Sequence, residues 1–249
     1  MTHAATRAHY QTLLAPIYRW MLGDFAAALA RSRLELDTLG IGPAGSGARA
    51  LDLGAGLGLQ AIPLHELGYR VTAVDSSDEL LAELHRDCPA VSLVTGDLAE
   101  LGRIATESYA VIVCMGDTLT HLASLEEVDA VLAAACAVLA PSGVLALTFR
   151  DYVAPVRESV DRFILVRADE SRIHTCCLDY GVSHVRVTDL LHERNAGTWA
   201  LRASAYDKVR LAHGWVAERL RAHGADSVRA ESSGGRITVV ARGAARSER

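Results

Sequence analysis

A glycine-rich loop between an apolar strand and a helix narrows the folds open to this chain. Residues 51–58 read Leu-Asp-Leu-Gly-Ala-Gly-Leu-Gly, and the apolar run before them begins at Arg49. Glycine adopts positive φ angles freely and lets a ligand pack against bare backbone. In an open sheet of parallel strands, such a loop lies at the crevice where the strand order reverses. The loop therefore predicts an α/β fold that binds a ligand at Gly54 and Gly56.

Strand-like and helix-like segments alternate around this loop. Apolar runs at 49–53, 71–75, 91–95, 110–115 and 144–149 predict five strands, and the segments 78–85 and 125–139 predict helices between them. This alternation is typical of a doubly wound parallel sheet with helices on both faces. Residues 227–232 and 236–241 flank Ser233-Gly234-Gly235 and predict an antiparallel hairpin. We therefore expect a seven-stranded, Rossmann-like sheet with five parallel strands and a C-terminal hairpin.

The rest of the chain predicts additions to this core. Residues 1–39 have apolar side chains at helical spacing and predict an N-terminal helical lid, which Pro16 divides into two helices. The core occupies 48–152 and 205–242, with its last helix from about Tyr206 to His223. Residues 153–204 predict an antiparallel β insertion that acts as a substrate lid. The tail at 243–249 is expected to be disordered.

Composition limits the partners and the location. The 249 residues carry a net charge of -5 with a pI near 6.0, so no basic surface indicates nucleic acid. No apolar stretch reaches the ~20 residues of a membrane helix, and no secretory leader is evident, so we expect a cytoplasmic protein. The cysteines form no Cys-x-x-Cys pair, which predicts free thiols and no metal site; they are Cys88, Cys114, Cys136, Cys176 and Cys177.

Three carboxylates in register with the strands point to the kind of ligand. Asp52, just before the loop, suits a cofactor with an amino-acid end, because an ammonium group needs an acceptor. Asp75 ends the second strand, where a carboxylate can accept both ribose hydroxyls of an adenosine. Asp97, in the Gly96-Asp97-Leu98 turn, can accept from the exocyclic amine of adenine. A dinucleotide-type loop would carry a third glycine where this chain has Leu59, which speaks against an NAD-dependent oxidoreductase.

From Ala48 to Phe149 these motifs resemble the class I S-adenosylmethionine-dependent methyltransferases. The resemblance implies S-adenosyl-L-methionine as cofactor, S-adenosyl-L-homocysteine as product and no catalytic metal. The cofactor-binding residues that it and the motifs imply are Tyr10, Asp52, Gly54, Ala55, Gly56, Asp75, Ser76, Gly96, Asp97, Leu98, Met115 and Gly116.

A looser resemblance links Cys114 to Leu122 and Phe149 to Tyr152 with the glycine and sarcosine N-methyltransferases. In that group an arginine after the fifth strand binds the substrate carboxylate, which implies this role for Arg150. An asparagine commonly stands there where this chain has Asp117. The resulting substrate-binding set is Tyr18, Asp117, Arg150, Tyr180, His184 and Arg186, and the catalytic candidates are His121, Arg150 and Tyr18.

Alternative interpretations remain open at this stage. Arg150 could instead pair with Asp151 or Asp117, and His121 could start or cap a helix. His184 and Arg186 share one strand face with His192, which more often means a solvated face.

The sequence as a whole predicts transfer of a methyl group to a nitrogen, oxygen or sulfur nucleophile of a small, carboxylate-bearing molecule by in-line displacement. Its rivals are an NAD-binding oxidoreductase, a non-catalytic S-adenosylmethionine-binding protein, and a nucleic-acid or protein methyltransferase. We expect no membrane partner. A monomer or a homodimer fits the exposed strand edges of the insertion.

Overall fold

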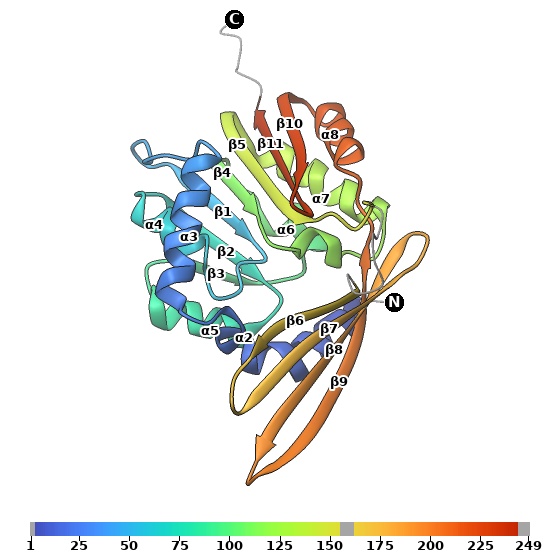
Figure 1. The fold of residues 1–249 in the computed structure, drawn as a ribbon. Helices are drawn as coiled ribbons and strands as arrows, with labels where there is room; N and C mark the ends of the chain where they lie inside the picture. The colour runs from blue at the N-terminus through green and yellow to red at the C-terminus, as the bar shows by residue number, and fades with distance from the viewer. Residues whose placement is uncertain (1–2, 155–161, 244–249) are drawn as a thin grey trace, which may run out of the picture.

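The computed structural model describes residues 3–154 and 162–243 and contains two sheets (Figure 1). The larger, seven-stranded sheet has the order β10-β11-β5-β4-β1-β2-β3. This confirms the predicted fold class, with the C-terminal hairpin joined to β5. Its strands are β1 (Arg49–Leu53), β2 (Arg70–Asp75), β3 (Ser92–Thr95), β4 (Tyr109–Cys114), β5 (Leu139–Arg150), β10 (Ala225–Ser233) and β11 (Arg236–Gly243).

Side-chain alternation along the buried strands supplies two cores. In β4, Val111 and Val113 point to one face of the sheet, while Ile112 and Cys114 point to the other. The first face is covered by α3 (Phe25–Thr38), α4 (Ala61–Glu66) and α5 (Asp78–Asp87). The second face is covered by α6 (Leu101–Ile104), α7 (Leu125–Val138) and α8 (His213–Ala222). Both faces are therefore buried, as parallel strands require.

The N-terminal segment is interrupted twice, at the predicted position by a 3₁₀ turn that contains Pro16 and again at Gly23. It comprises α1 (His3–His9), a π-helical turn η1 (Tyr10–Leu14), a 3₁₀ turn η2 (Ala15–Ile17) and α2 (Tyr18–Leu22). Pro16 lies in the first turn of η2, where its missing N–H costs no hydrogen bond. Gly23 has a φ of 75°, and Asp24 then caps α3 by accepting from the Ala27 N–H at 3.1 Å.

The insertion forms a separate antiparallel sheet in the order β6-β7-β8-β9. Its strands are β6 (Phe163–Ala168), β7 (Arg172–Tyr180), β8 (His184–Asn195) and β9 (Thr198–Val209). The expected helix start near Tyr206 is wrong, because the β8–β9 ladder continues until His184 meets Val209. The helix α8 begins only at His213. The predicted insertion also covers 155–161, and the predicted tail 244–249; both lie outside the described residues.

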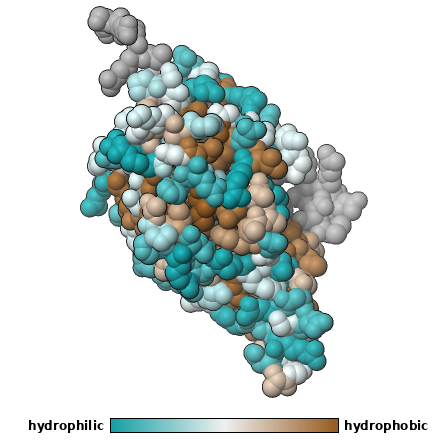
Figure 2. Space-filling view, turned by 90° about the vertical axis from the view of Figure 1, so that its left-hand side faces the viewer, coloured by the Kyte–Doolittle hydropathy of each residue, from teal (hydrophilic) through white to brown (hydrophobic). Residues whose placement is uncertain are grey.

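The insertion sheet lies next to the carboxyl ends of the core strands, with the N-terminal helices against it (Figure 1). Leu13, Leu14 and Ile17 pack on Leu191 of β8. Within the described ranges 3–154 and 162–243, no helix is long and apolar enough to cross a bilayer. On the side that carries α3 and α4, hydrophilic residues interrupt the hydrophobic patches (Figure 2).

Candidate functional site

The glycine loop that follows β1 adopts the backbone expected of it. Gly54, Gly56 and Gly58 have φ angles of 73°, 53° and 81°, which side chains strongly disfavour. A Cβ at Gly54 would come within 2.2 Å of the Thr118 side chain, so this glycine allows close packing inside the protein. At Gly56 the nearest atom would be 3.9 Å away, on Tyr18. Gly56 is therefore the glycine that faces open space.

Asp75 fixes the loop from the end of β2. Its Oδ2 accepts from the Gly56 N–H at 2.8 Å, and its Oδ1 accepts from the Ser77 N–H at 2.8 Å. Burial raises the pKa of this carboxyl above its ordinary value, although backbone hydrogen bonds oppose the shift. Each carboxylate oxygen can accept more than one hydrogen bond, so Asp75 retains capacity for a ligand.

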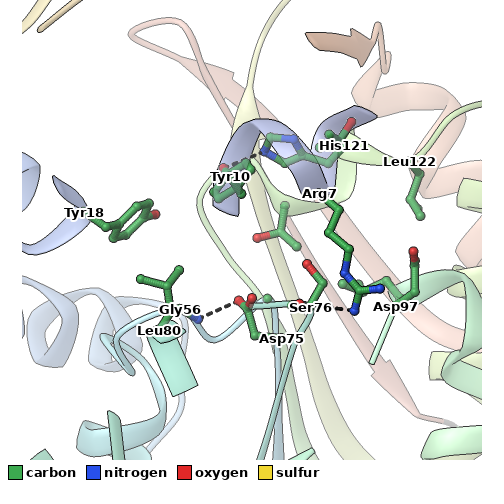
Figure 3. A pocket seen from close by; sticks show the side chains of 14 residues that line it. Arg7, Tyr10, Tyr18, Gly56, Asp75, Ser76, Leu80, Asp97, His121 and Leu122 are labelled. Atoms are coloured by element: carbon green, nitrogen blue, oxygen red, sulfur yellow. Dashed lines mark hydrogen bonds between the residues drawn. The ribbon is translucent and has the colours of Figure 1, made fainter. Parts of the chain in front are cut away.

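A cavity lies directly above this loop, and we call it the loop cavity. Asp75, Ser76, Asp97 and Gly56 form its polar floor, and Leu80, Leu98 and Leu122 are apolar wall residues. Figure 3 shows Arg7, Tyr10 and Tyr18 reaching over it from the N-terminal segment. The Arg7 guanidinium donates to the Ser76 carbonyl at 3.3 Å. The N-terminal segment thus contributes Arg7, Tyr10 and Tyr18 to the wall of the loop cavity, and its role as a lid stays a prediction.

A second space, the inner cavity, continues from the loop cavity toward the insertion sheet and measures about 330 Å³. Both cavities are lined by Gly54, Gly56, Tyr10, Tyr18 and His121. Its far wall consists of side chains from β7, β8 and β9, namely His174, Cys176, Leu178, Val187, Asp189, Tyr206 and Lys208. The two cavities therefore meet at the glycine loop, where Tyr10 and Tyr18 of the N-terminal segment line both.

A buried ion pair joins the core to the insertion at the inner cavity. The Lys208 Nζ lies 2.6 Å from Asp117 Oδ2, and Asp117 also accepts from the Tyr152 hydroxyl at 3.0 Å and the Arg150 N–H at 2.7 Å. Burial alone would raise the pKa of Asp117, but the Lys208 charge and these hydrogen bonds hold it well below its usual range. Asp117 is thus a permanently charged anchor, not a base.

The sequence left open whether Arg150 pairs with Asp117 or with Asp151, and the structure shows neither pair. The Arg150 side chain does not pair with it, and Asp151 instead accepts from Ser232 at 2.6 Å. Within 3–154 and 162–243, the guanidinium of Arg150 has no ion-pair partner. It lines the inner cavity.

Asp189 on β8 forms a second buried cluster at the same cavity. His9 Nε2 donates to its Oδ2 at 2.9 Å, and His174 Nε2 donates to its Oδ1 at 2.8 Å. All three residues are at most 3% exposed. Burial raises the pKa of Asp189, but the two histidine hydrogen bonds outweigh this and lower it to about 2. The cluster ties the helix α1 to the insertion sheet.

His121 lies where the loop cavity and the inner cavity join. Its Nε2 is hydrogen bonded to the Tyr10 hydroxyl at 3.2 Å, and its ring stacks on Tyr206 with centroids 5.3 Å apart. Burial, followed by the Lys208 charge, lowers the pKa of His121 to about 3. Burial and nearby carboxylates raise the pKa of Tyr18 to about 12. At neutral pH, His121 is thus an uncharged ring and Tyr18 a hydrogen-bond donor.

The structure brings most of the predicted site residues together. Fourteen of them line the loop cavity or the inner cavity: Tyr10, Tyr18, Gly54, Ala55, Gly56, Asp75, Ser76, Asp97, Leu98, Met115, Gly116, Asp117, His121 and Arg150. His121 ends the 3₁₀ turn η4 (Thr118–His121), so it neither starts nor caps a helix.

Five predicted residues lie elsewhere. Asp52 is 1% exposed beneath the loop, where burial raises its pKa to about 7. Gly96 donates to the Asp75 carbonyl at 3.0 Å and packs near Ile104. Neither lines either cavity, so direct contact with a ligand is not supported for them.

The predicted substrate residues on the insertion need the same correction. His184 contacts the Ala123 carbonyl through Nε2 at 3.0 Å, and Arg186 pairs with Asp207 at 3.7 Å on the exposed face of β8. Both leave the candidate set, because β8 turns its other face to the cavity. Tyr180 lines neither cavity but a separate one, beside α3 and the turn of the β10–β11 hairpin.

Sequence reasoning missed the polar residues on the inward face of the insertion. In β8 the buried positions are Val185, Val187, Asp189 and Leu191, so an acid interrupts an otherwise apolar alternation. That interruption was the available signal, because an unpaired buried carboxylate is costly and implies partners. His174 in β7 and Lys208 in β9 interrupt their strands in the same way.

Comparison with known proteins defines the class to which this fold and site correspond. Residues 50–143 match a family described as "Methyltransferase domain". The sheet order and the loop cavity agree with this match, which covers less than half of the chain. The predicted resemblance to the class I S-adenosylmethionine-dependent methyltransferases is confirmed.

Individual relatives show which methyltransferases part of this chain resembles. The chain is 32% identical over 108 residues to the glycine/sarcosine N-methyltransferase of Aphanothece halophytica, covering 42% of this chain and 41% of that protein. The enzyme of the same name from Halorhodospira halochloris matches equally, at 32% identity over 42% of this chain and 40% of that protein. The match therefore spans only about two fifths of the length of these relatives.

Solved structures extend the likeness in fold to most of the chain. Streptomyces venezuelae DesVI superposes with a TM-score of 0.77 at 17% identity, covering 92% of this chain and 98% of that one. The sugar N-methyltransferase KedS8 from a Streptoalloteichus species has a TM-score of 0.69 at 17% identity, covering 91% of both chains. At this identity the comparison shows a shared fold over most of each chain.

Proposed function

We propose that this protein is an S-adenosylmethionine-dependent methyltransferase that acts on a small molecule. The observation that carries the proposal is the meeting of the loop cavity and the inner cavity at Gly54 and Gly56. A methyl donor bound on the loop would face an acceptor held by the insertion. Both would lie beneath Tyr10 and Tyr18, away from bulk water.

The residues of the loop cavity fit this cofactor. Gly56 presents bare backbone, and Asp75 stands beside it with acceptor capacity for ribose hydroxyls. Leu80, Leu98 and Leu122 supply apolar contacts for a flat purine ring. The amino-acid end would extend past Gly54 into the inner cavity, which lies along the same loop.

Catalysis would rest on orientation and the exclusion of water. The cofactor would supply a methyl group on a sulfonium. A lone pair on the acceptor would form the new bond to the methyl carbon in line with the carbon–sulfur bond, which would break as the thioether leaves with its electron pair. Holding the two partners in position can contribute most of the acceleration of such a reaction. The Tyr18 hydroxyl lines the site and would donate a hydrogen bond to a ligand there, and Tyr10 with His121 forms the wall at the junction. The low pKa of His121 suits an uncharged hydrogen-bonding ring better than a general base.

The acceptor is best matched by a carboxylate-bearing amine. The relatives are named glycine/sarcosine N-methyltransferases, and KedS8 is named a sugar N-methyltransferase. Arg150 offers a guanidinium fork that can take a carboxylate by two hydrogen bonds. Its freedom from Asp117 and Asp151 supports this role.

Calorimetry with S-adenosylhomocysteine tests the cofactor. Binding in the micromolar to low millimolar range is expected, and NAD is expected not to compete. A panel of glycine, sarcosine and amino sugars, read out as S-adenosylhomocysteine release, then tests the acceptor. If S-adenosylhomocysteine does not bind at millimolar concentration, the proposed function is wrong. Binding without turnover on any acceptor would favour the non-catalytic rival.

A further inference from the structure

His174 is a buried imidazole on the wall of the inner cavity. It lines this cavity together with Cys176 and Leu178, which lie on the same face of β7. Its Nε2 donates to Asp189 at 2.8 Å, and within 3–154 and 162–243 its Nδ1 has no hydrogen-bond partner. The side chain is only 1% exposed. A buried polar atom without a partner is costly, and a residue that lines a cavity can find its partner in a ligand.

Asp189 fixes which nitrogen of this ring carries a proton. Burial raises the pKa of Asp189, but its hydrogen bonds with the two histidines lower it to about 2, so the carboxylate is ionised at neutral pH. An ionised carboxylate only accepts hydrogen bonds, so the Nε2 of His174 carries the proton and the Nδ1 of the neutral ring has a free lone pair. A carboxylate in this position also stabilises the imidazolium that forms when the ring accepts a proton.

The other ionisable groups on this wall cannot take up a proton at neutral pH. The pKa of Asp117 is held well below its usual range by Lys208, against the effect of burial, and burial lowers that of His121 to about 3. Burial raises the pKa of Tyr18 and of the Cys176 thiol to about 12, so both already carry a proton. The remaining groups are also protonated: tyrosines whose pKa burial raises, and two cations, namely Tyr10, Tyr152, Tyr206, Arg150 and Lys208.

An amine acceptor needs a group that removes a proton. Aliphatic amines have ordinary pKa values of about 8–10 and are mostly ammonium ions at neutral pH. An ammonium nitrogen has no lone pair with which to attack a methyl group. The inner cavity, at about 330 Å³, lies at the small end of the range for ligand sites, so a ligand that fills it contacts both ends. A tetrahedral nitrogen there can turn one position to the glycine loop and another to the wall that carries His174.

We propose that His174, oriented by Asp189, is the general base that takes a proton from the ammonium group of an amine acceptor. An N–H bond of the ammonium would break, the proton would pass to the Nδ1 of His174, and the electron pair would stay on the acceptor nitrogen. That lone pair would then form the bond to the methyl carbon as the carbon–sulfur bond breaks, giving a methylated ammonium and a neutral thioether. The proton on His174 would pass to water after product release. This inference rests on the proposed function and adds the chemical class of the acceptor, an amine that is protonated at neutral pH.

His9 provides a matched comparison within the same cluster. Its Nε2 donates to the other oxygen of Asp189 at 2.9 Å, and its ring packs on Tyr206 with centroids 4.4 Å apart. Unlike His174, it lines neither the loop cavity nor the inner cavity. Both histidines hold Asp189, and His174 alone of the two borders the space for the acceptor.

The test is the pH dependence of methyl transfer in His174→Gln. A glutamine amide can donate to Asp189 in place of Nε2, but it cannot take a proton from an ammonium ion. Wild type and variant are compared on the acceptor of the panel above that releases S-adenosylhomocysteine fastest. At about pH 7 we expect kcat/KM to fall about 100-fold or more. At about pH 10, where the free amine forms without a base, the loss should shrink to less than about tenfold.

Two controls separate catalysis from structure. His9→Gln makes the same change in the same cluster, and any loss of kcat/KM that it causes should be equal at all pH values. The affinity for S-adenosylhomocysteine should change less than about twofold in His174→Gln, because His174 does not line the loop cavity.

Two kinetic results would overturn the inference. One is a loss in His174→Gln that does not change with pH, as in His9→Gln, which would indicate a structural role. The other is a loss below about threefold at pH 7, which would indicate that the acceptor loses its proton elsewhere.

The ring nitrogens decide the matter if no acceptor in the panel turns over. Long-range ¹H–¹⁵N NMR spectra of the labelled protein at about pH 8 locate the ring proton, and the signal that His174→Gln removes belongs to His174. A proton on Nε2 alone would support the inference, and a proton on Nδ1 would overturn it. The proposed function fails separately, when S-adenosylhomocysteine does not bind.

Discussion

Replacing Lys208 by methionine tests whether the Lys208–Asp117 pair holds the insertion on the core. Methionine keeps the length of the side chain and removes only the charge and the donors. Asp117 would keep two donors, the Tyr152 hydroxyl and the Arg150 N–H. It would lose the cation 2.6 Å from its Oδ2.

The structure sets the expected size of the effect. The Lys208 side chain is 7% exposed and that of Asp117 is 25% exposed, so water can replace the lost partner only in part. Removing one member of a buried pair costs about 3–5 kcal/mol. The two remaining donors and the partial exposure of Asp117 favour the lower end. For a chain of this size, about 3 kcal/mol corresponds to a fall in Tm of roughly 6–12 °C.

The sign of the pH dependence follows from the lowered pKa of Asp117. A carboxyl whose pKa is depressed by folding contributes stability above its unfolded pKa, and this contribution is lost as the pH falls through the folded value. The difference between wild type and Lys208→Met should therefore be full at neutral pH and narrow below about pH 4.

Urea unfolding followed by circular dichroism measures these differences. In a cycle with Asp117→Asn, the double variant should be more stable than the sum of the single losses predicts, by at least about 1 kcal/mol. Arg186→Met is the control, because the exposed Arg186–Asp207 pair should contribute less than about 1 kcal/mol. A loss below about 1 kcal/mol in Lys208→Met, or an equal loss in the control, would refute the assignment.

Three further predictions concern the site. Asp75→Asn should weaken S-adenosylhomocysteine about tenfold or more by calorimetry, because it removes a charged acceptor that also fixes Gly56; unchanged affinity would contradict the cofactor assignment. Arg150→Ala should raise the KM for a carboxylate-bearing acceptor about tenfold or more while changing cofactor affinity less than about twofold, and equal effects on both ligands would argue against its role. Wild type should lose about 1.5 kcal/mol of its free energy of unfolding as the pH falls from about 6.5 to about 5, and His121→Phe should keep it. The reason is that His121 binds a proton in the unfolded state but not in the buried, folded state. Parallel pH–stability curves for the two proteins would contradict the low pKa of His121.

Local sequence patterns were sufficient to predict the core sheet and the residues at the edge where its loop cavity lies. The β1 run, the glycine loop and Asp75 are close together in the chain or at the ends of adjacent parallel strands. Strand periodicity and the rule that carboxyl ends of such strands share one edge therefore placed Gly56, Asp75 and Asp97 around one cavity.

Local sequence patterns were insufficient to predict which residues of the insertion line the cavity. His184 and Arg186 looked like site residues because they are polar, whereas the pleat of β8 turns Val187 and Asp189 toward the cavity. Which face of a strand points inward depends on what covers it, and here the cover includes His9, Leu13, Leu14 and Ile17 from the other end of the chain. The partners His9 and Asp189 are 180 residues apart, beyond the range of any local pattern.

The sequence by itself determined the class of fold and the edge of the sheet where a ligand binds. Glycine spacing and hydrophobic periodicity act within a few residues, and parallel strands repeat one geometry. Only the tertiary structure decided which charged side chains of the site are paired and which are not. Lys208 neutralises Asp117, His9 and His174 enclose Asp189, and Arg150 is left to line the inner cavity. Pairing depends on distance in space, and burial strengthens it by excluding the water that would otherwise screen each charge.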